Sequence, residues 1–299
     1  MFYVFLSICC SVTVSVLLKL AKRYQVDVYQ AITWNYSAAI LLTWVFFRPQ
    51  LAMIHHIPTA TYLSLFSLGI LFPLVFVLMG TSVRLAGIVR TDAAQRLSLF
   101  IPILSAFLIF SETPNQVKII GIAMGIISII FLIPWKEKRA VRRRSTNSWF
   151  YLVVIFVGFG VIDVLLKQIA KVTAVPFTTS LFIIFILAFI LSVVGLIYLI
   201  ATKKTKFSWP HILIGWILGV VNFGNIFFYI KAHQALAKNP STVFSSMNIG
   251  VIVLGTLVGF FIFREKLSRL NLAGIILAII AIVIISFPEL FERIGVFLF

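Results

Sequence analysis

The sequence FLIFSETPNQVKIIGIAMGIISIIFLIP, residues 107–134, decides the fold, because a related stretch occurs a second time in the chain. Residues 260–287, FFIFREKLSRLNLAGIILAIIAIVIISF, align with it without gaps, and nine of the 28 positions are identical. Matches of Ile and Phe are frequent between any two membrane segments, so two other matches carry most of the weight: Glu112 with Glu265 and Gly121 with Gly274. The alignment indicates two related halves.

The chain as a whole has the composition of a membrane protein. Apolar residues make up 62% and charged residues 11% of its 299 residues, whereas soluble domains hold roughly 45–50% and 25%. The apolar residues form blocks long enough to cross a hydrocarbon core of about 30 Å as helices. A membrane barrel would instead show alternating segments of about ten residues. The ten predicted spans are 2–22, 29–47, 61–83, 88–110, 117–135, 149–170, 176–200, 210–231, 244–263 and 270–287.

Each half contains five predicted spans, and because five is odd, the two halves enter the membrane in opposite directions. Inverted repeats recur in secondary transporters, where the substrate site lies near the midplane between the halves. The predicted fold class is therefore an all-α integral membrane protein with ten transmembrane helices in two inverted five-helix repeats. Its predicted parts are a first repeat, a basic linker loop, a second repeat and a short C-terminal tail: 1–135, 136–148, 149–287 and 288–299.

This pattern resembles the drug/metabolite transporter superfamily of the EamA type. The shared features are five plus five spans, a Glu that closes the fourth span of each half and a Gly inside the fifth: Glu112, Glu265, Gly121 and Gly274. The resemblance covers nearly the whole chain and implies a ten-helix transporter of small metabolites, often an exporter. It also implies that spans one to four and six to nine surround a cavity, that spans five and ten are peripheral, and that both glutamates orient turns between spans.

Basic residues are distributed unevenly between the two sides of the membrane. Side B, defined as the side of the first loop, carries 18 of the 25 Lys and Arg residues, including the run KEKRAVRRR at 136–144. Basic residues accumulate in cytoplasmic loops, so we expect side B to be cytoplasmic and both termini to be external. Members of the resembled family usually have both termini inside. The placement also explains the net charge of +17 without a nucleic-acid partner.

Motifs for catalysis or cofactor binding are missing from the sequence. It contains no His-Glu-x-x-His, no Gly-x-Ser-x-Gly and no P-loop. The two cysteines, Cys9 and Cys10, are neighbours on one predicted helix and point about 100° apart, so we expect no disulfide between them. We therefore predict no enzyme, no metal site and no cofactor. The expected partners are a small-molecule substrate and the lipid bilayer, and the expected state is a monomer or a weak homodimer.

Charged residues inside the spans are the main functional signal, because a charge at the bilayer centre costs ~2.5–3.5 kcal/mol on insertion scales. Asp92 and Arg96 in span four have the acid-then-base spacing that favours an intrahelical pair, and Asp163 and Lys167 in span six repeat it. We expect the two pairs to be gates within polar clusters at opposite mouths of the bundle: Lys19, Asp92, Gln95 and Arg96 near side B, and Asp163, Lys167, Ser245 and Asn248 near side A. The alternative is that they are interfacial charges.

A polar stripe lies between the two clusters. The sequence GVVNFGNIFFY, residues 219–229, places Asn222, Asn225 and Tyr229 on one face of span eight. The stripe has two interpretations: it forms the wall of a cavity, or it packs helices together with Gly215 and Gly219. Two residues of span two are weaker candidates for the cavity, one of which also suits an interface anchor: Asn35 and Trp34.

Two functions fit these patterns. The first is a secondary transporter that moves a small metabolite by alternating access, with Asp92 or Asp163 as the carrier if transport is coupled to protons. The second is a flippase or carrier for a lipid-linked or phosphorylated substrate, for which Arg96 and Lys19 would supply the cations. The predicted location is the cell membrane, which the chain crosses many times.

Overall fold

A computed structural model describes residues 1–23, 26–52, 57, 59–86, 88–113, 115–132, 148–262 and 268–293. The regular structure of these ranges is helical and they contain no strand, which confirms the predicted all-α class. The helices are α1 (Phe2–Arg23), α2 (Val28–Phe47), α3 (Thr59–Ala86), α4 (Ile88–Leu97), α5 (Phe100–Leu108), α6 (Gln116–Leu132), α7 (Ser148–Lys171), α8 (Phe177–Ala201), α9 (Pro210–Ala235), α10 (Pro240–Phe261), α11 (Arg269–Ser286) and α12 (Pro288–Arg293).

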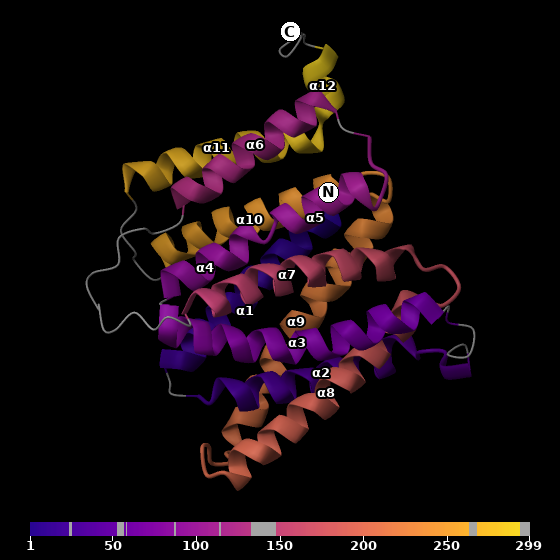
Figure 1. Ribbon diagram of the computed structural model, residues 1–299, viewed down its shortest axis with the longest axis vertical. Coiled ribbons are helices and arrows are strands. Elements are labelled where there is room, and N and C mark those ends of the chain that lie inside the picture. Colours follow the sequence, from indigo (N-terminus) through magenta and orange to yellow (C-terminus); the bar gives the residue numbers. More distant parts are fainter. Residues whose placement is uncertain are drawn as a thin grey trace.

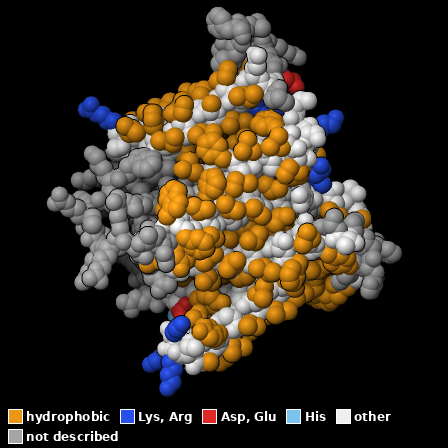
Figure 2. Space-filling model, viewed as in Figure 1, with side chains coloured by type: hydrophobic (Ala, Val, Ile, Leu, Met, Phe, Trp, Pro, Cys, Tyr) orange, Lys and Arg blue, Asp and Glu red, His pale blue; other side chains and the backbone are white. Residues whose placement is uncertain are grey.

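The helices have the length and the surface of membrane spans. Within the described ranges, six are long and apolar enough to cross a bilayer: α3, α7, α8, α9, α10 and α11. Figure 2 shows apolar side chains covering the visible face, with Lys and Arg gathered at its edges. A soluble monomer rarely exposes a continuous apolar patch larger than a few hundred Å². The protein is therefore embedded in a membrane and crosses it several times.

Several helix ends are defined by side chains in the connecting loops. The carboxylate of Asp27 accepts hydrogen bonds from the backbone N–H groups of Tyr29 and Gln30, at 2.9 and 3.3 Å, and so begins α2. Ser268 and Asn271 form a reciprocal capping box at the start of α11. These caps satisfy backbone N–H groups that have no partner within the helix.

Span four is the main departure from the predicted helices. A continuous helix was expected over 88–110, but α4 ends at Leu97 and α5 begins at Phe100. Pro102 explains the break, because it has no N–H and its ring would clash with the carbonyl of Ser98 in a continuous helix. That carbonyl accepts from the Ile101 N–H instead, at 3.0 Å. The interruption lies midway along the span.

Glycines allow the closest contacts between helices. A Cβ on Gly219 of α9 would lie 2.6 Å from the carbonyl oxygen of Asn35 in α2, and one on Gly215 would lie 2.7 Å from that of Ala31. On α6, a Cβ on Gly121 would lie 2.8 Å from Ile285 of α11. Helices α6 and α11, which carry the repeated sequence, therefore pack directly on each other (Figure 1).

Polar contacts join helix ends at side A, the side opposite the first loop. The buried carboxylate of Glu112 follows α5, forms an ion pair of 2.7 Å with Lys118 of α6, and accepts from the Ser241 N–H of α10 at 2.8 Å. These contacts fix Glu112 in the connection between α5 and α6, whereas Glu265 lies outside the described residues, and the role of both in orienting turns stays a prediction. Met1 and Glu289 line one hollow at this side, so the start of α1 and the end of α11 lie together.

Candidate functional site

A cavity of about 190 Å³ lies in the middle of the bundle. Its described lining comes from α1, α2, α3, α4, α7, α9 and α10 and from Ser98 beside the helix break, and none comes from α6, α8 or α11. An engineered cavity of about 150 Å³ holds benzene, so this central cavity has room for a compact metabolite. Among the described residues, no three His, Cys, Asp or Glu side chains are grouped to hold a metal ion.

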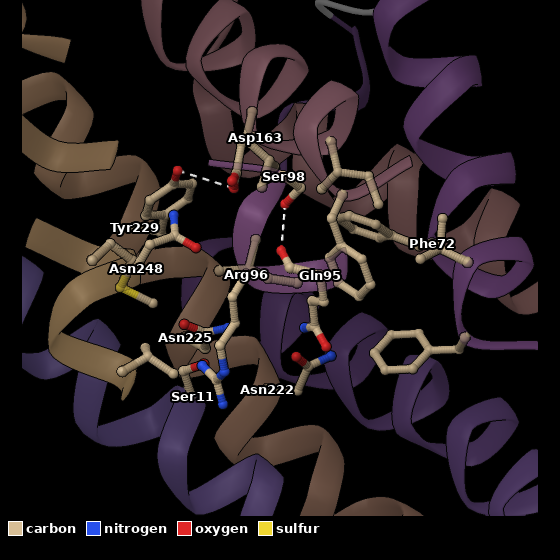
Figure 3. A pocket seen from close by; sticks show the side chains of 18 of the residues that line it. Ser11, Phe72, Gln95, Arg96, Ser98, Asp163, Asn222, Asn225, Tyr229 and Asn248 are labelled. Carbon is tan, nitrogen blue, oxygen red and sulfur yellow. Dashed lines mark hydrogen bonds between the residues drawn. The ribbon is translucent and has the colours of Figure 1, made fainter. Parts of the chain in front are cut away.

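Most of the polar residues singled out in the sequence meet at this central cavity. The candidates that line it, seen in Figure 3, are Gln95, Arg96, Asp163, Asn222, Asn225, Tyr229 and Asn248. The residues of the two predicted clusters therefore line one cavity, with Asp163 and Asn248 toward one end and the Arg96 guanidinium toward the other (Figure 3), and, Arg96 apart, their position at the mouths of the bundle stays a prediction. Arg96 lies one residue before the end of α4. Its side chain therefore starts near the helix break, midway along the span, and not near side B as predicted.

One end of the central cavity is formed around an acid. The hydroxyl of Tyr229 on α9 donates a hydrogen bond of 3.0 Å to Oδ1 of Asp163 on α7. Asn248 on α10 lines the cavity beside this carboxylate (Figure 3), and its Nδ2 donates to the carbonyl oxygen of Phe244 at 3.0 Å. The carboxylate thus joins α7 to α9 at the cavity wall, next to α10.

Lys167 is not the partner of Asp163, which corrects the predicted second gate. Its Nζ donates to the carbonyl oxygens of His233 and Ala237, at 3.3 and 3.2 Å, beside the C-terminal end of α9. The last carbonyls of a helix lack partners within it, and a cation there is stabilised by the helix dipole. Lys167 is 1% exposed. It therefore acts as a buried cap for α9, and Asp163 is left to Tyr229.

A cation lies at the other end of the central cavity. In Figure 3 the guanidinium of Arg96 extends toward Ser11 of α1 and Asn225 of α9, away from Asp163. The side chains of Lys19 and Asp92 lie outside the described part of the structure. The predicted pairing of Asp92 with Arg96 and the contribution of Lys19 therefore stay predictions.

The two asparagines of the α9 stripe fit both of its interpretations, as part of a cavity wall and as a contact between helices. Asn222 lines the central cavity and donates from Nδ2 to Oδ1 of Asn35 on α2, at 3.1 Å. Asn225 also lines it, and its Oδ1 accepts from the hydroxyl of Ser7 on α1 at 2.9 Å. The same amides therefore face the cavity and join α9 to its neighbours.

Three predicted site residues lie away from the cavity lining. Asn35 lies behind Asn222 and is 2% exposed. Trp34 packs against Phe189 of α8, with ring centroids 6.2 Å apart. Ser245 is fully buried within α10. Their positions around the helix axes direct these side chains toward neighbouring helices. The sequence of a single helix does not show which of its sides faces a cavity.

The remaining cavity wall was not predicted from the sequence. Its apolar part comes mainly from α3, α7 and α10: Phe72, Val75, Phe76, Phe159, Ile162, Leu166, Met247 and Val251, with Ile226 of α9. Three polar residues complete it: Ser11, Tyr36 and Ser98. Phenylalanine occurs at 30 positions in the chain, so no single one stands out. The cavity therefore combines a polar side with an apolar wall.

Comparisons with known proteins show a relative in sequence and a solved structure with a similar fold. No family model matches the chain. A protein of Haemophilus influenzae (strain ATCC 51907 / DSM 11121 / KW20 / Rd), described as uncharacterized, is 45% identical over 282 residues, covering 92% of this chain and 94% of that protein. A crystal structure of another protein superposes with a TM-score of 0.74 over 98% of this chain and 97% of that one. Its sequence identity is 15%, so that likeness concerns the fold alone.

Proposed function

We propose that this chain, which belongs to the same family as the Haemophilus influenzae protein, is a secondary transporter that exports a small metabolite across the cell membrane. The observation that carries the proposal is the central cavity, with Asp163 and Arg96 at opposite ends and amides between them. Ionisable groups inside membrane spans generally mark substrate or ion pathways. A space of about 190 Å³ suits a compact solute better than a lipid.

The proposal includes ten crossings in two inverted halves. In this arrangement α4 and α5 make one crossing together and α12 lies outside the membrane. Two observations support it: the repeated segments α6 and α11 pack on each other, and Met1 lies at the same side as Glu289. An even number of crossings brings both chain ends to one side. By the distribution of basic residues, that side is external.

Alternating access would follow from movement of one half against the other around the central cavity. Asp163 on α7 is joined to α9 by the hydrogen bond that its carboxylate accepts from Tyr229. Protonation removes the charge and one acceptor site, which weakens the attachment to Tyr229. If transport is coupled to protons, Asp163 is therefore the carrier, and its protonation alters contacts between helices.

The test reconstitutes the purified full chain in liposomes. Uptake is screened over small metabolites, and flipping of a labelled lipid is measured in parallel. We expect solute transport without lipid flipping. Flipping without transport of any solute would favour the lipid-linked alternative.

A matched pair of substitutions on α1 ties the result to the central cavity. Ser11→Phe places a ring at a lining position, and we expect it to reduce transport more than tenfold. Thr13→Phe adds the same ring at an exposed position of the same helix and should leave transport within twofold. Equal losses in both variants would mean that the cavity is not the route.

A further inference from the structure

Another hollow at side A, of about 530 Å³, opens where α7 gives way to α8 and is distinct from the one lined by Met1 and Glu289. It is lined by the end of α7, the connection 172–176, the first residue of α8 and the last turn of α9. These helix ends lie at the right-hand edge of the bundle in Figure 1. We call it the side-A hollow. The side-A hollow and the central cavity are lined by successive turns of α7 and α9.

The side-A hollow is basic. Lys167 and Lys171 line it, and no described Asp or Glu does. Both Nζ atoms lie over the ring of Phe110, at 5.9 and 5.2 Å from its centroid. The carboxylate that acts on Lys167 from a distance, Glu112, is already paired with Lys118. Two ammonium groups are thus held close together without an acid in the lining.

His233 adds a buried polar group to the same lining. It is fully buried, and neither ring nitrogen has a hydrogen-bond partner in the protein. The rings of Tyr229 and Phe244 hold it, with centroids 4.8 and 4.7 Å away. Buried polar groups nearly always have a partner. An imidazole N–H in the wall of the side-A hollow is therefore a donor suited to a ligand.

The start of α8 contributes a third feature. Val175, Pro176 and Phe177 line the side-A hollow, and Pro176 provides no side-chain cap for this helix of 25 residues. The first N–H groups of a helix lack partners within it, and the helix dipole gives its N-terminal end a partial positive charge. Anions bind such ends.

We propose that the side-A hollow is a binding site for an oxyanion, a phosphate or carboxylate group. Lys171, the imidazole of His233 and the N-terminal end of α8 are its donors, and Lys167 adds buried positive charge. The oxyanion comes either from the headgroup of an anionic phospholipid on side A or from a free anion. The site goes beyond the proposed transport function and does not depend on it.

Thermal unfolding of the purified full chain in a neutral detergent tests the site. It is measured with inorganic phosphate, with phosphatidylglycerol and with phosphatidylcholine, at one ionic strength. A ligand that binds only the folded protein raises the unfolding temperature, by about 2 °C at ten times its Kd for a chain of this length. A rise with phosphatidylglycerol alone supports a lipid headgroup, and a rise with phosphate alone or with both supports a site open to free anions. No rise with either, or an equal rise with phosphatidylcholine, overturns the proposal.

Matched variants locate the effect. Lys171→Gln removes an exposed charge at the rim of the side-A hollow and should abolish the rise. Lys238→Gln removes an exposed charge at the same side outside the hollow and should keep it. His233→Gln retains a donor in the wall and should weaken the rise without abolishing it. Equal losses in Lys171→Gln and Lys238→Gln would indicate a general charge effect and refute the site.

Discussion

Glu112 and Asp163 are both carboxylates enclosed by helices, but their partners differ in kind. Glu112 has a buried cation at 2.7 Å, a backbone N–H at 2.8 Å and the Ser241 hydroxyl at 2.5 Å. Asp163 accepts a hydrogen bond from a phenol, that of Tyr229, and it lines the central cavity next to the Asn248 amide. The first carboxylate is compensated by the protein alone. Among the described residues, the second has only a neutral hydrogen-bond partner, which is the state expected of a group that exchanges a proton or meets a substrate.

The largest expected effect is the loss of stability on removing Glu112. Glu112→Ala leaves Lys118 buried at 4% exposure without its ion-pair partner. Breaking a buried ion pair from one side costs about 3–5 kcal/mol. We expect a fall of that size in the free energy of unfolding, measured in detergent by thermal or chemical denaturation.

The double variant Glu112→Gln with Lys118→Met sharpens this prediction. It removes both charges, so it should recover part of the stability that Glu112→Ala loses. Additive losses would show that the two charges are not coupled. Lys118 would then not compensate the charge of Glu112, and the proposed difference between Glu112 and Asp163 would not hold.

The second prediction concerns Asp163 and should show the opposite pattern. The side-chain oxygen of Asn can accept the hydrogen bond from the Tyr229 hydroxyl, as the carboxylate of Asp does. Asp163→Asn should therefore change the free energy of unfolding by about 1 kcal/mol or less. Because Asn cannot carry a proton, transport driven by a pH gradient should fall more than tenfold, while exchange of labelled for unlabelled substrate continues. Loss of both gradient-driven transport and exchange would assign Asp163 to substrate binding and not to coupling.

The architecture was accessible from the sequence because it depends on local patterns. Apolar blocks predicted the helices within a few residues, as in 176–200 for α8, observed at Phe177–Ala201. The break in span four was missed although Pro102 was visible. Pro73 lies inside an uninterrupted α3, so a proline in a span predicts a break only together with the surrounding packing.

The candidate site was only partly accessible. A polar residue inside a span is conspicuous, so Gln95, Asp163 and Asn222 could be named before their positions were known. Their partners could not be named, because these depend on contacts between distant segments. The spacing of Asp163 and Lys167 suggested an ion pair, but the end of α9 offered Lys167 two carbonyl oxygens. Spacing within one helix shows which side chains can meet, and not which ones do.

The smallest expected effect concerns a third acid, Asp27, which lies outside the spans near side B. Its carboxylate accepts from the Thr205 hydroxyl, the Gln30 amide and two backbone N–H groups. Partial burial acts to raise the pKa of Asp27, but these hydrogen bonds outweigh it and the pKa lies below its usual value. Like Asp163, this acid has neutral partners, but it is close to water and stays ionised.

A lowered pKa makes Asp27 stabilising above the pKa of the unfolded chain, about 3.9, and that stabilisation is lost as the pH falls through the folded value. The side chain is partly exposed, so the contribution should be only a few tenths of a kcal/mol. We expect the free energy of unfolding of the parent chain, minus that of Asp27→Asn, to fall by this amount between about pH 5 and pH 3. Asn retains the helix cap, so the difference isolates the charge. If this difference rises as the pH is lowered, burial outweighs the hydrogen bonds and raises the pKa of Asp27. Neutral partners would then be insufficient to keep a carboxylate ionised, even at the membrane edge.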